Sequence, residues 1–106
     1  MPLRPVTFYL PSSSSIQVFF SDMLKEDLSV QNFEIESLTG TSANLTIKSI
    51  EVNKNSVKIN TNPQNARTYY LLRFKDSEEF PFVSKSGDQL INDKVSRTLY
   101  FVAAED

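Results

Sequence analysis

The stretch of this 106-residue chain that most restricts its fold is residues 50–59, which read Ile-Glu-Val-Asn-Lys-Asn-Ser-Val-Lys-Ile. Two alternating halves flank Lys54 and Asn55, a pattern typical of a β-hairpin. Folding at that dipeptide sets three pairs opposite one another across the strands: Ile50 with Ile59, Glu51 with Lys58, and Val52 with Val57. One face is then aliphatic and the other carries opposite charges. A slip of one residue would move every aliphatic side chain into water, so the pattern fixes the register and predicts one buried face.

The same alternation of apolar and other residues recurs before the hairpin, at residues 6–10, 16–20 and 33–36. It predicts strands whose inward side chains begin with Val6, Ile16 and Phe33. Phe19 is the oddity in this pattern, because its parity turns a large aromatic ring outward. The glutamates at positions 34 and 36 share the wet face of their strand.

Two departures from simple alternation are predicted in the first half of the chain. Ser21 or Asp22 is a candidate N-cap for a short helical turn over residues 24–28. Further along, the apolar positions 45 and 47 have the opposite parity to positions 50 and 52. A bulge or corner at Lys48-Ser49 must therefore reset the phase of the strand.

After the hairpin, residues 69–75 form the clearest strand, with Tyr70, Leu72 and Phe74 expected inward. Residues 76–94 do not alternate, but their apolar side chains predict an ordered loop folded back over the core: Phe80, Phe82, Leu90 and Ile91. Residues 97–103 are β-prone on both faces, and there we expect the side chains at positions 99 and 101 to point inward.

These segments add up to about seven short strands, with turn signals roughly every ten residues. No amphipathic helix longer than two turns is present in the pattern. The sequence therefore predicts an all-β fold, an immunoglobulin-like antiparallel β-sandwich. A chain of this length makes one core, so residues 1–106 are expected to be a single domain.

The composition excludes several classes of function. Histidine and cysteine are absent, which removes thiol nucleophiles, imidazole bases, Cys/His zinc sites and disulfides. The net charge is -2 and the basic residues are dispersed, so we expect no nucleic-acid partner. With Gly40 and Gly87 as the only glycines, a phosphate-binding loop and a nucleotide cofactor are not expected. No apolar run approaches the ~20 residues that span a bilayer, so no membrane insertion is expected.

Carboxylates are the remaining candidates for chemistry. Glu34 and Glu36 lie about 7 Å apart along one strand, a spacing that a hydrolase could use, although such glutamates are ordinarily solvated charge. The loop 76–94 carries oxygen ligands suited to calcium, without any fixed ligand spacing: Asp76, Glu78, Glu79, Asp88, Asn92 and Asp93. We expect no enzyme activity, no catalytic residue, no cofactor and no defined metal site, with calcium binding by the loop left open.

Three segments together resemble bacterial immunoglobulin-like repeats: Ser15-Ile-Gln-Val-Phe-Phe-Ser-Asp-Met-Leu, Phe33-Glu-Ile, and Asn65-Ala-Arg-Thr-Tyr-Tyr-Leu-Leu. Those repeats have a strand ending in Val-x-Phe-Ser, an acidic loop, an Asn-Phe strand and a late Gly-Thr-x-Tyr strand. The resemblance spans residues 6–75, with residues 95–103 as the last strand. The chain departs from the family at residues 76–94, where a longer aromatic excursion stands in place of a short acidic loop.

The resemblance implies a role for the late tyrosine, which maps onto Tyr70. Such a residue can form a tyrosine corner, in which its hydroxyl bonds backbone upstream, here near Asn65 or Ala66. Plain core packing is the alternative reading of Tyr70.

The resemblance also implies a setting for the chain. Modules of this family usually occur in tandem in large extracellular proteins, as spacers and adhesive arms of bacterial surface layers, adhesins and secreted polysaccharide-degrading enzymes, or on phage tails and capsids. We therefore expect a non-catalytic structural module excised from a larger multidomain protein. Its location is expected to be extracellular, at the cell surface or in a virion, and its partners neighbouring domains or other subunits.

Four aromatic side chains with outward parity form the candidate binding surface: Tyr9, Phe19, Tyr69 and Tyr100. Exposed aromatics can bury a neighbouring domain or stack on sugar rings. We favour contact with a domain or subunit, and the alternative is a carbohydrate-binding accessory domain of a secreted polysaccharide-degrading enzyme. The alternative requires the aromatics to form one flat row on a single sheet.

Overall fold

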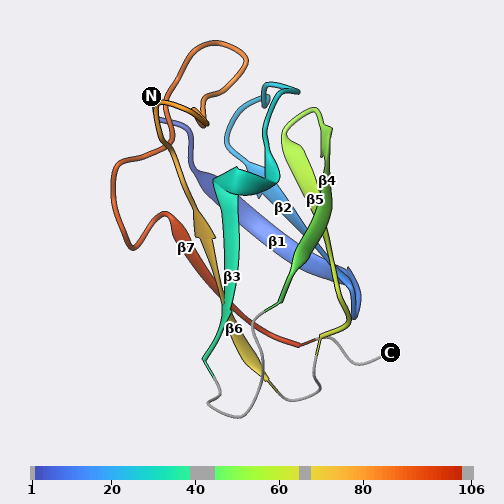
Figure 1. Ribbon diagram of the computed structural model, residues 1–106. Coiled ribbons are helices and arrows are strands. Elements are labelled where there is room, and N and C mark those ends of the chain that lie inside the picture. The colour runs from blue at the N-terminus through green and yellow to red at the C-terminus, as the bar shows by residue number, and fades with distance from the viewer. Residues whose placement is uncertain (1, 39–44, 65–67, 104–106) are drawn as a thin grey trace.

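The computed structural model describes residues 2–38, 45–64 and 68–103 of the chain. The described residues form seven strands and one 3₁₀ helix, shown in Figure 1: β1 (Pro5–Ser12), β2 (Ser15–Phe20), the 3₁₀ helix (Val30–Asn32), β3 (Phe33–Ser37), β4 (Ile47–Asn53), β5 (Ser56–Thr61), β6 (Tyr69–Phe74) and β7 (Thr98–Val102). Within these ranges, no helix has the length and apolar character needed to cross a membrane.

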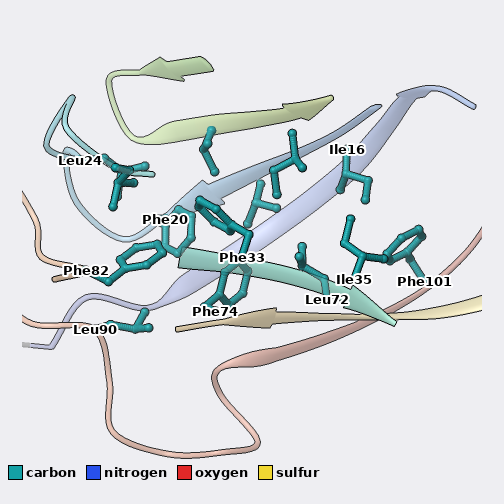
Figure 2. Close-up of a cluster of buried hydrophobic side chains, with 14 of the residues drawn as sticks. Ile16, Phe20, Leu24, Phe33, Ile35, Leu72, Phe74, Phe82, Leu90 and Phe101 are labelled. Atoms are coloured by element: carbon teal, nitrogen blue, oxygen red, sulfur yellow. The ribbon is translucent and has the colours of Figure 1, made fainter. Parts of the chain in front are cut away.

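The strands form two sheets, ordered β1-β2-β5-β4 and β3-β6-β7, and every pairing is antiparallel. A four-stranded and a three-stranded sheet in this order are the two layers of a constant-type immunoglobulin sandwich. The prediction of an all-β antiparallel sandwich of about seven strands is confirmed. The two sheets enclose one layer of apolar side chains, which Figure 2 shows between them.

The central hairpin has the predicted register. β4 and β5 pair Ile50 with Ile59, Glu51 with Lys58 and Val52 with Val57. Val57 and Ile59 are fully buried, while the β4 partners are partly buried and pack against the core. The pairing of β4 with β5 shifts register between Ile47 and Ser49, where the parity of the apolar residues required a bulge.

The core is closed at one end by aromatic rings from both sheets and from the long loop. The Phe82 ring lies 5.4 Å from that of Phe20 on β2 and 5.5 Å from that of Phe33 on β3, between ring centroids. Phe82 is fully buried and Leu90 is 2% exposed, and Figure 2 shows both at this end of the strands, pointing into the core. The prediction that residues 76–94 fold back over the core is confirmed.

Backbone hydrogen bonds tie this loop to the start of the chain. Leu3 donates its N–H to Gln89 O at 2.8 Å, and Ile91 donates to Leu3 O at 2.8 Å. Leu24 forms an antiparallel bridge with Ser84. The loop is therefore an ordered part of the domain, held by both hydrogen bonds and apolar burial.

The structure corrects the placement of Val6, whose side chain is 66% exposed. The register of β1 against β2 shifts between Pro5 and Thr7, and this bulge reverses the parity of the strand on its N-terminal side. Phe8 and Leu10, beyond the bulge, pack against the core as alternation predicts.

The structure also corrects the helical turn expected over residues 24–28 with Ser21 or Asp22 as its cap. Leu24 is extended there and donates its N–H to Lys54 O at 2.9 Å, so its backbone bonds go to other segments. The short helix forms further on, at Val30–Asn32, where the Ser29 hydroxyl accepts a hydrogen bond from Gln31 N at 3.2 Å.

Candidate functional site

The outer face of the β3-β6-β7 sheet carries an exposed apolar cluster. Cross-strand pairing sets Tyr69 opposite Val102 and Leu71 opposite Tyr100, and Leu38, directly after β3, donates its N–H to Tyr69 O. Four of these side chains are exposed by between 47% and 67%, while Leu71 beneath them is 6% exposed. We call this set the contact patch: Leu38, Tyr69, Leu71, Tyr100 and Val102.

The other half of the same face is charged. Glu34 on β3 forms an ion pair with Lys75. The guanidinium of Arg73 lies 3.1 Å from the carboxylate of Glu36 and 3.8 Å from that of Glu34. The hydrogen bond from Lys75 lowers the pKa of Glu34 below its ordinary value. A general acid at neutral pH needs a shift in the opposite direction. The paired glutamates therefore act here as partners of basic side chains.

A groove of about 530 Å³ separates this charged half from the segment before β7. Its rim holds four cations, namely Arg73, Lys75, Lys94 and Arg97. Three of them have carboxylate partners within the chain: Arg73 with Glu36, Lys75 with Glu34, and Arg97 with Asp76 at 3.8 Å. The positive charge of the groove is thus largely neutralised from within, which does not favour a dedicated anion site.

The predicted aromatic residues divide between two opposite faces of the sandwich. Tyr69 and Tyr100 belong to the contact patch. Tyr9 and Phe19 lie on the outer face of the β1-β2 pair, where their rings stack with centroids 6.1 Å apart and an interplanar angle of 19°. The Tyr9 hydroxyl donates to Gln17 Oε1 at 2.8 Å. The four rings therefore do not make the single row that the carbohydrate alternative requires.

Tyr70 lies on the inner face of β6 and is fully buried. Its ring stacks on that of Phe101, with centroids 5.4 Å apart. The backbone predicted to receive its hydroxyl, at Asn65 or Ala66, lies outside the described residues. The tyrosine corner thus stays a prediction, while the inward orientation of Tyr70 is observed.

Replacing Tyr70 with phenylalanine tests the corner. Removing a buried, hydrogen-bonded hydroxyl leaves its partner unsatisfied, which costs about 1 to 3 kcal/mol. Tyr70→Phe is therefore expected to lower the free energy of unfolding by that amount, as measured by urea titration. Tyr100→Phe removes an exposed hydroxyl by the same change and is the matched control, with an expected loss near zero. Equal stability of the two variants would leave only ring packing at Tyr70.

Two acidic residues of the 76–94 loop, Asp76 and Asp93, bond to separate partners within the chain. Asp76 accepts a hydrogen bond from Phe82 N at 2.9 Å, and Asp93 accepts from Ser96 Oγ at 2.9 Å. Asp22, outside the loop, accepts from Ser86 Oγ at 2.7 Å, and this bond lowers the pKa of its carboxyl. Over the described ranges, the structure groups no three Asp, Glu, His or Cys side chains in a way that could hold a metal ion.

Sequence reasoning did not identify Leu38 and Val102 as members of the surface cluster. Both have a usable signal, because Leu38 follows the outward parity of Glu34 and Glu36, and Val102 follows that of Tyr100. It also missed Asn32, a buried side chain whose amide nitrogen donates to Lys75 O at 2.9 Å and to Phe80 O at 2.7 Å. Its one local bond, from Ser29 N to Oδ1 at 2.9 Å, closes the capping box of the 3₁₀ helix. The two acceptors of its amide nitrogen lie more than forty residues away, so no local pattern predicts them.

Comparison with known proteins gives a fold and no family. No protein-family model matches the chain, and no curated protein matches it in sequence.

Three solved structures of bacterial surface-layer proteins are similar in fold. The structure of the N-terminal part of the bacterial S-layer protein SbsC aligns over 97% of this chain with a TM-score of 0.77 and 18% identity. The S-layer protein rSbsC(31-844) and domains 1-6 of the surface layer protein SbsC each align over 96% of it, with a TM-score of 0.76 and 17% identity. The chain spans 24% of the first of these proteins and 14% of each of the other two. At such identities the likeness is one of fold.

Proposed function

We propose that this chain is a non-catalytic immunoglobulin-like module of a large bacterial surface protein, in which it spaces neighbouring domains and contacts them or other subunits. The observation that carries this proposal is the match of nearly the whole chain to one part of much longer surface-layer proteins. The family resemblance of its strand motifs supports the same reading. Because the similar structures are surface-layer proteins, we favour the cell surface over a virion.

The positions of the first and last strands support a spacer. β1 begins at the end of the sandwich where the long loop lies, and β7 ends at the opposite end (Figure 1). Just before β1, Leu3 is hydrogen-bonded to the long loop, and just after β7, Ala103 donates its N–H to Thr68 O at 2.9 Å. The longest extent of the molecule is 39 Å. Domains joined to these two positions would be held apart along the long axis of the sandwich.

The contact patch supports the binding part of the proposal. It is a contiguous apolar surface bordered by ion pairs, and such surfaces on folded domains mark protein interfaces. The distribution of aromatic rings over two faces gives the carbohydrate alternative less support. If the chain binds glycans on an array and the Tyr100→Ala variant does not, that preference would be reversed.

Surface location is the most direct test. Intact cells that make the protein are treated with trypsin, and the chain is followed by immunoblot with an antibody raised against this domain. The proposal expects the signal to disappear from intact cells while a cytoplasmic marker survives. A chain that is protected until the cells are lysed would contradict the proposal.

A further inference from the structure

Strand β7 presents an unpaired backbone edge. Ala103 donates its N–H to Thr68 O and Phe74 donates to Arg97 O, both at 2.9 Å. Hydrogen-bonded pairs alternate along an antiparallel ladder, so it is Leu99 and Phe101 that bond to β6. The N–H and C=O groups of Tyr100 and Val102 then point away from the sheet, and they have no other backbone partner among the residues that the structure describes.

The other three sheet edges each carry features that hinder pairing with another strand. β1 contains Pro5 and Pro11 and two register shifts. β3 carries Glu34 and Glu36, and β4 carries two charged residues and a bulge. Prolines, charges and bulges are the devices by which edge strands avoid pairing.

β7, by contrast, reads Thr-Leu-Tyr-Phe-Val, with no charge, proline or glycine. In the described strand its pairing with β6 runs without a register shift. An edge strand that is uncharged and rich in aromatic and β-branched residues is a template for another strand. The absence of charge also means that two copies of β7 can approach without repulsion between like charges.

We propose that β7 pairs antiparallel with β7 of a second copy of this chain, about a two-fold axis at Phe101. This register sets Tyr100 opposite Val102 of the second copy, and Val102 opposite its Tyr100, so that the free groups of each residue meet a donor and an acceptor. The N–H of Thr98 donates to Val95 O within its own chain at 3.3 Å. The proposed register leaves that bond in place, because the pairing of Tyr100 with Val102 does not use the Thr98 N–H.

The side chains fit the same arrangement. Tyr100 beside Val102 is an aromatic and β-branched cross-strand pair, one of the favourable combinations. The two three-stranded sheets become one continuous sheet, and both contact patches lie at its centre. The ion pairs of Glu34, Glu36, Arg73 and Lys75 lie on β3 and on or directly after β6, away from the shared edge, so no charged pair has to lose its water when two β7 strands meet. The inference deepens the proposed function and relies on it for the biological use of the contact.

Amide hydrogen exchange of the unmodified chain, measured by NMR from about 10 μM to about 1 mM, tests the pairing. The amides of Leu99 and Phe101 bond to β6 and should be protected at every concentration. Those of Tyr100 and Val102 should exchange rapidly when dilute and become protected as concentration rises. The expected result is that protection depends on concentration at Tyr100 and Val102 but not at Leu99 and Phe101. Exchange of Tyr100 and Val102 that does not depend on concentration overturns the pairing.

Sedimentation of two matched variants separates edge pairing from stacking of the outer faces. Tyr100→Lys puts a charged side chain on the edge and should weaken self-association at least about tenfold. Tyr69→Lys makes the same change on the same face, but on the central strand, and should change it less than about threefold. Equal loss in both variants would show face-to-face association and overturn the proposal. A chain that is monomeric at every concentration overturns it too, and leaves the surface location to be judged by the trypsin experiment.

Discussion

Val57→Asp is expected to unfold the domain at room temperature. Val57 is fully buried on β5, a central strand, between Val18 of β2 and Val52 of β4. An aspartate there would be an ionised group without a partner, which costs several kcal/mol. Domains of this kind have about 5 to 15 kcal/mol of stability in total. Loss of the sheet signal in circular dichroism, and of dispersed amide resonances, is the measurement.

Val6→Asp makes the same chemical change at a valine that is 66% exposed. The expected change in the free energy of unfolding is below about 0.5 kcal/mol, because the carboxylate stays in water. The pair of variants tests both the phase of the hairpin and the bulge in β1. A folded Val57→Asp variant would contradict the hairpin phase, and an unfolded Val6→Asp variant would contradict the exposure of Val6.

The strands were predictable where alternation is uninterrupted. The register of β4 with β5 follows from the sequence because a slip exposes aliphatic side chains, and the break before Ile50 follows because parity changes there. Val6 was predicted to point inward because the alternation of its segment was read as continuous. A bulge next to Pro5 interrupts it, and this bulge depends on how β1 meets β2, which neither the parity nor the composition of the segment reveals.

The helical turn over residues 24–28 was wrong because the backbone there has distant partners. The Leu24 N–H bonds to the turn at Lys54, and Leu24 also forms a bridge with Ser84 in the loop. A local capping signal at Ser21 or Asp22 cannot compete with such bonds, and tertiary context overrides weak helix propensity. The loop itself was predicted to be ordered because its apolar side chains need burial.

The candidate surface was predictable only in part. The position of a residue in the alternation of its strand predicts whether its side chain points to the core or away from it, and Tyr9, Tyr69 and Tyr100 are indeed exposed. The alternation does not predict to which of the two sheets a strand belongs. The division of the aromatics between two faces, and hence the reduced support for a sugar-binding row, required the order of the strands.

Asn32→Asp is expected to lower the free energy of unfolding by about 3 to 5 kcal/mol. Asn32 is 1% exposed. Its amide nitrogen donates to the carbonyls of Lys75 and Phe80, and its Oδ1 accepts from Ser29 N at 2.9 Å. A carboxylate keeps the acceptor but loses both donors, so it would set buried negative charge against two carbonyl oxygens. Urea titration monitored by circular dichroism gives the value.

Gln31→Glu is the matched control, because it converts the neighbouring exposed amide to a carboxylate and should change stability by less than about 0.5 kcal/mol. The long loop is held both by the Asn32 amide and by the burial of Phe82. The two variants also distinguish these two contributions. If the amide fixes the start of the loop, Asn32→Asp should speed hydrogen exchange at residues 75–82 beyond the rest of the sandwich, because local opening would no longer break those two bonds. Uniformly faster exchange would instead mean that loop and sandwich unfold as one unit, with Phe82 as the anchor that couples them.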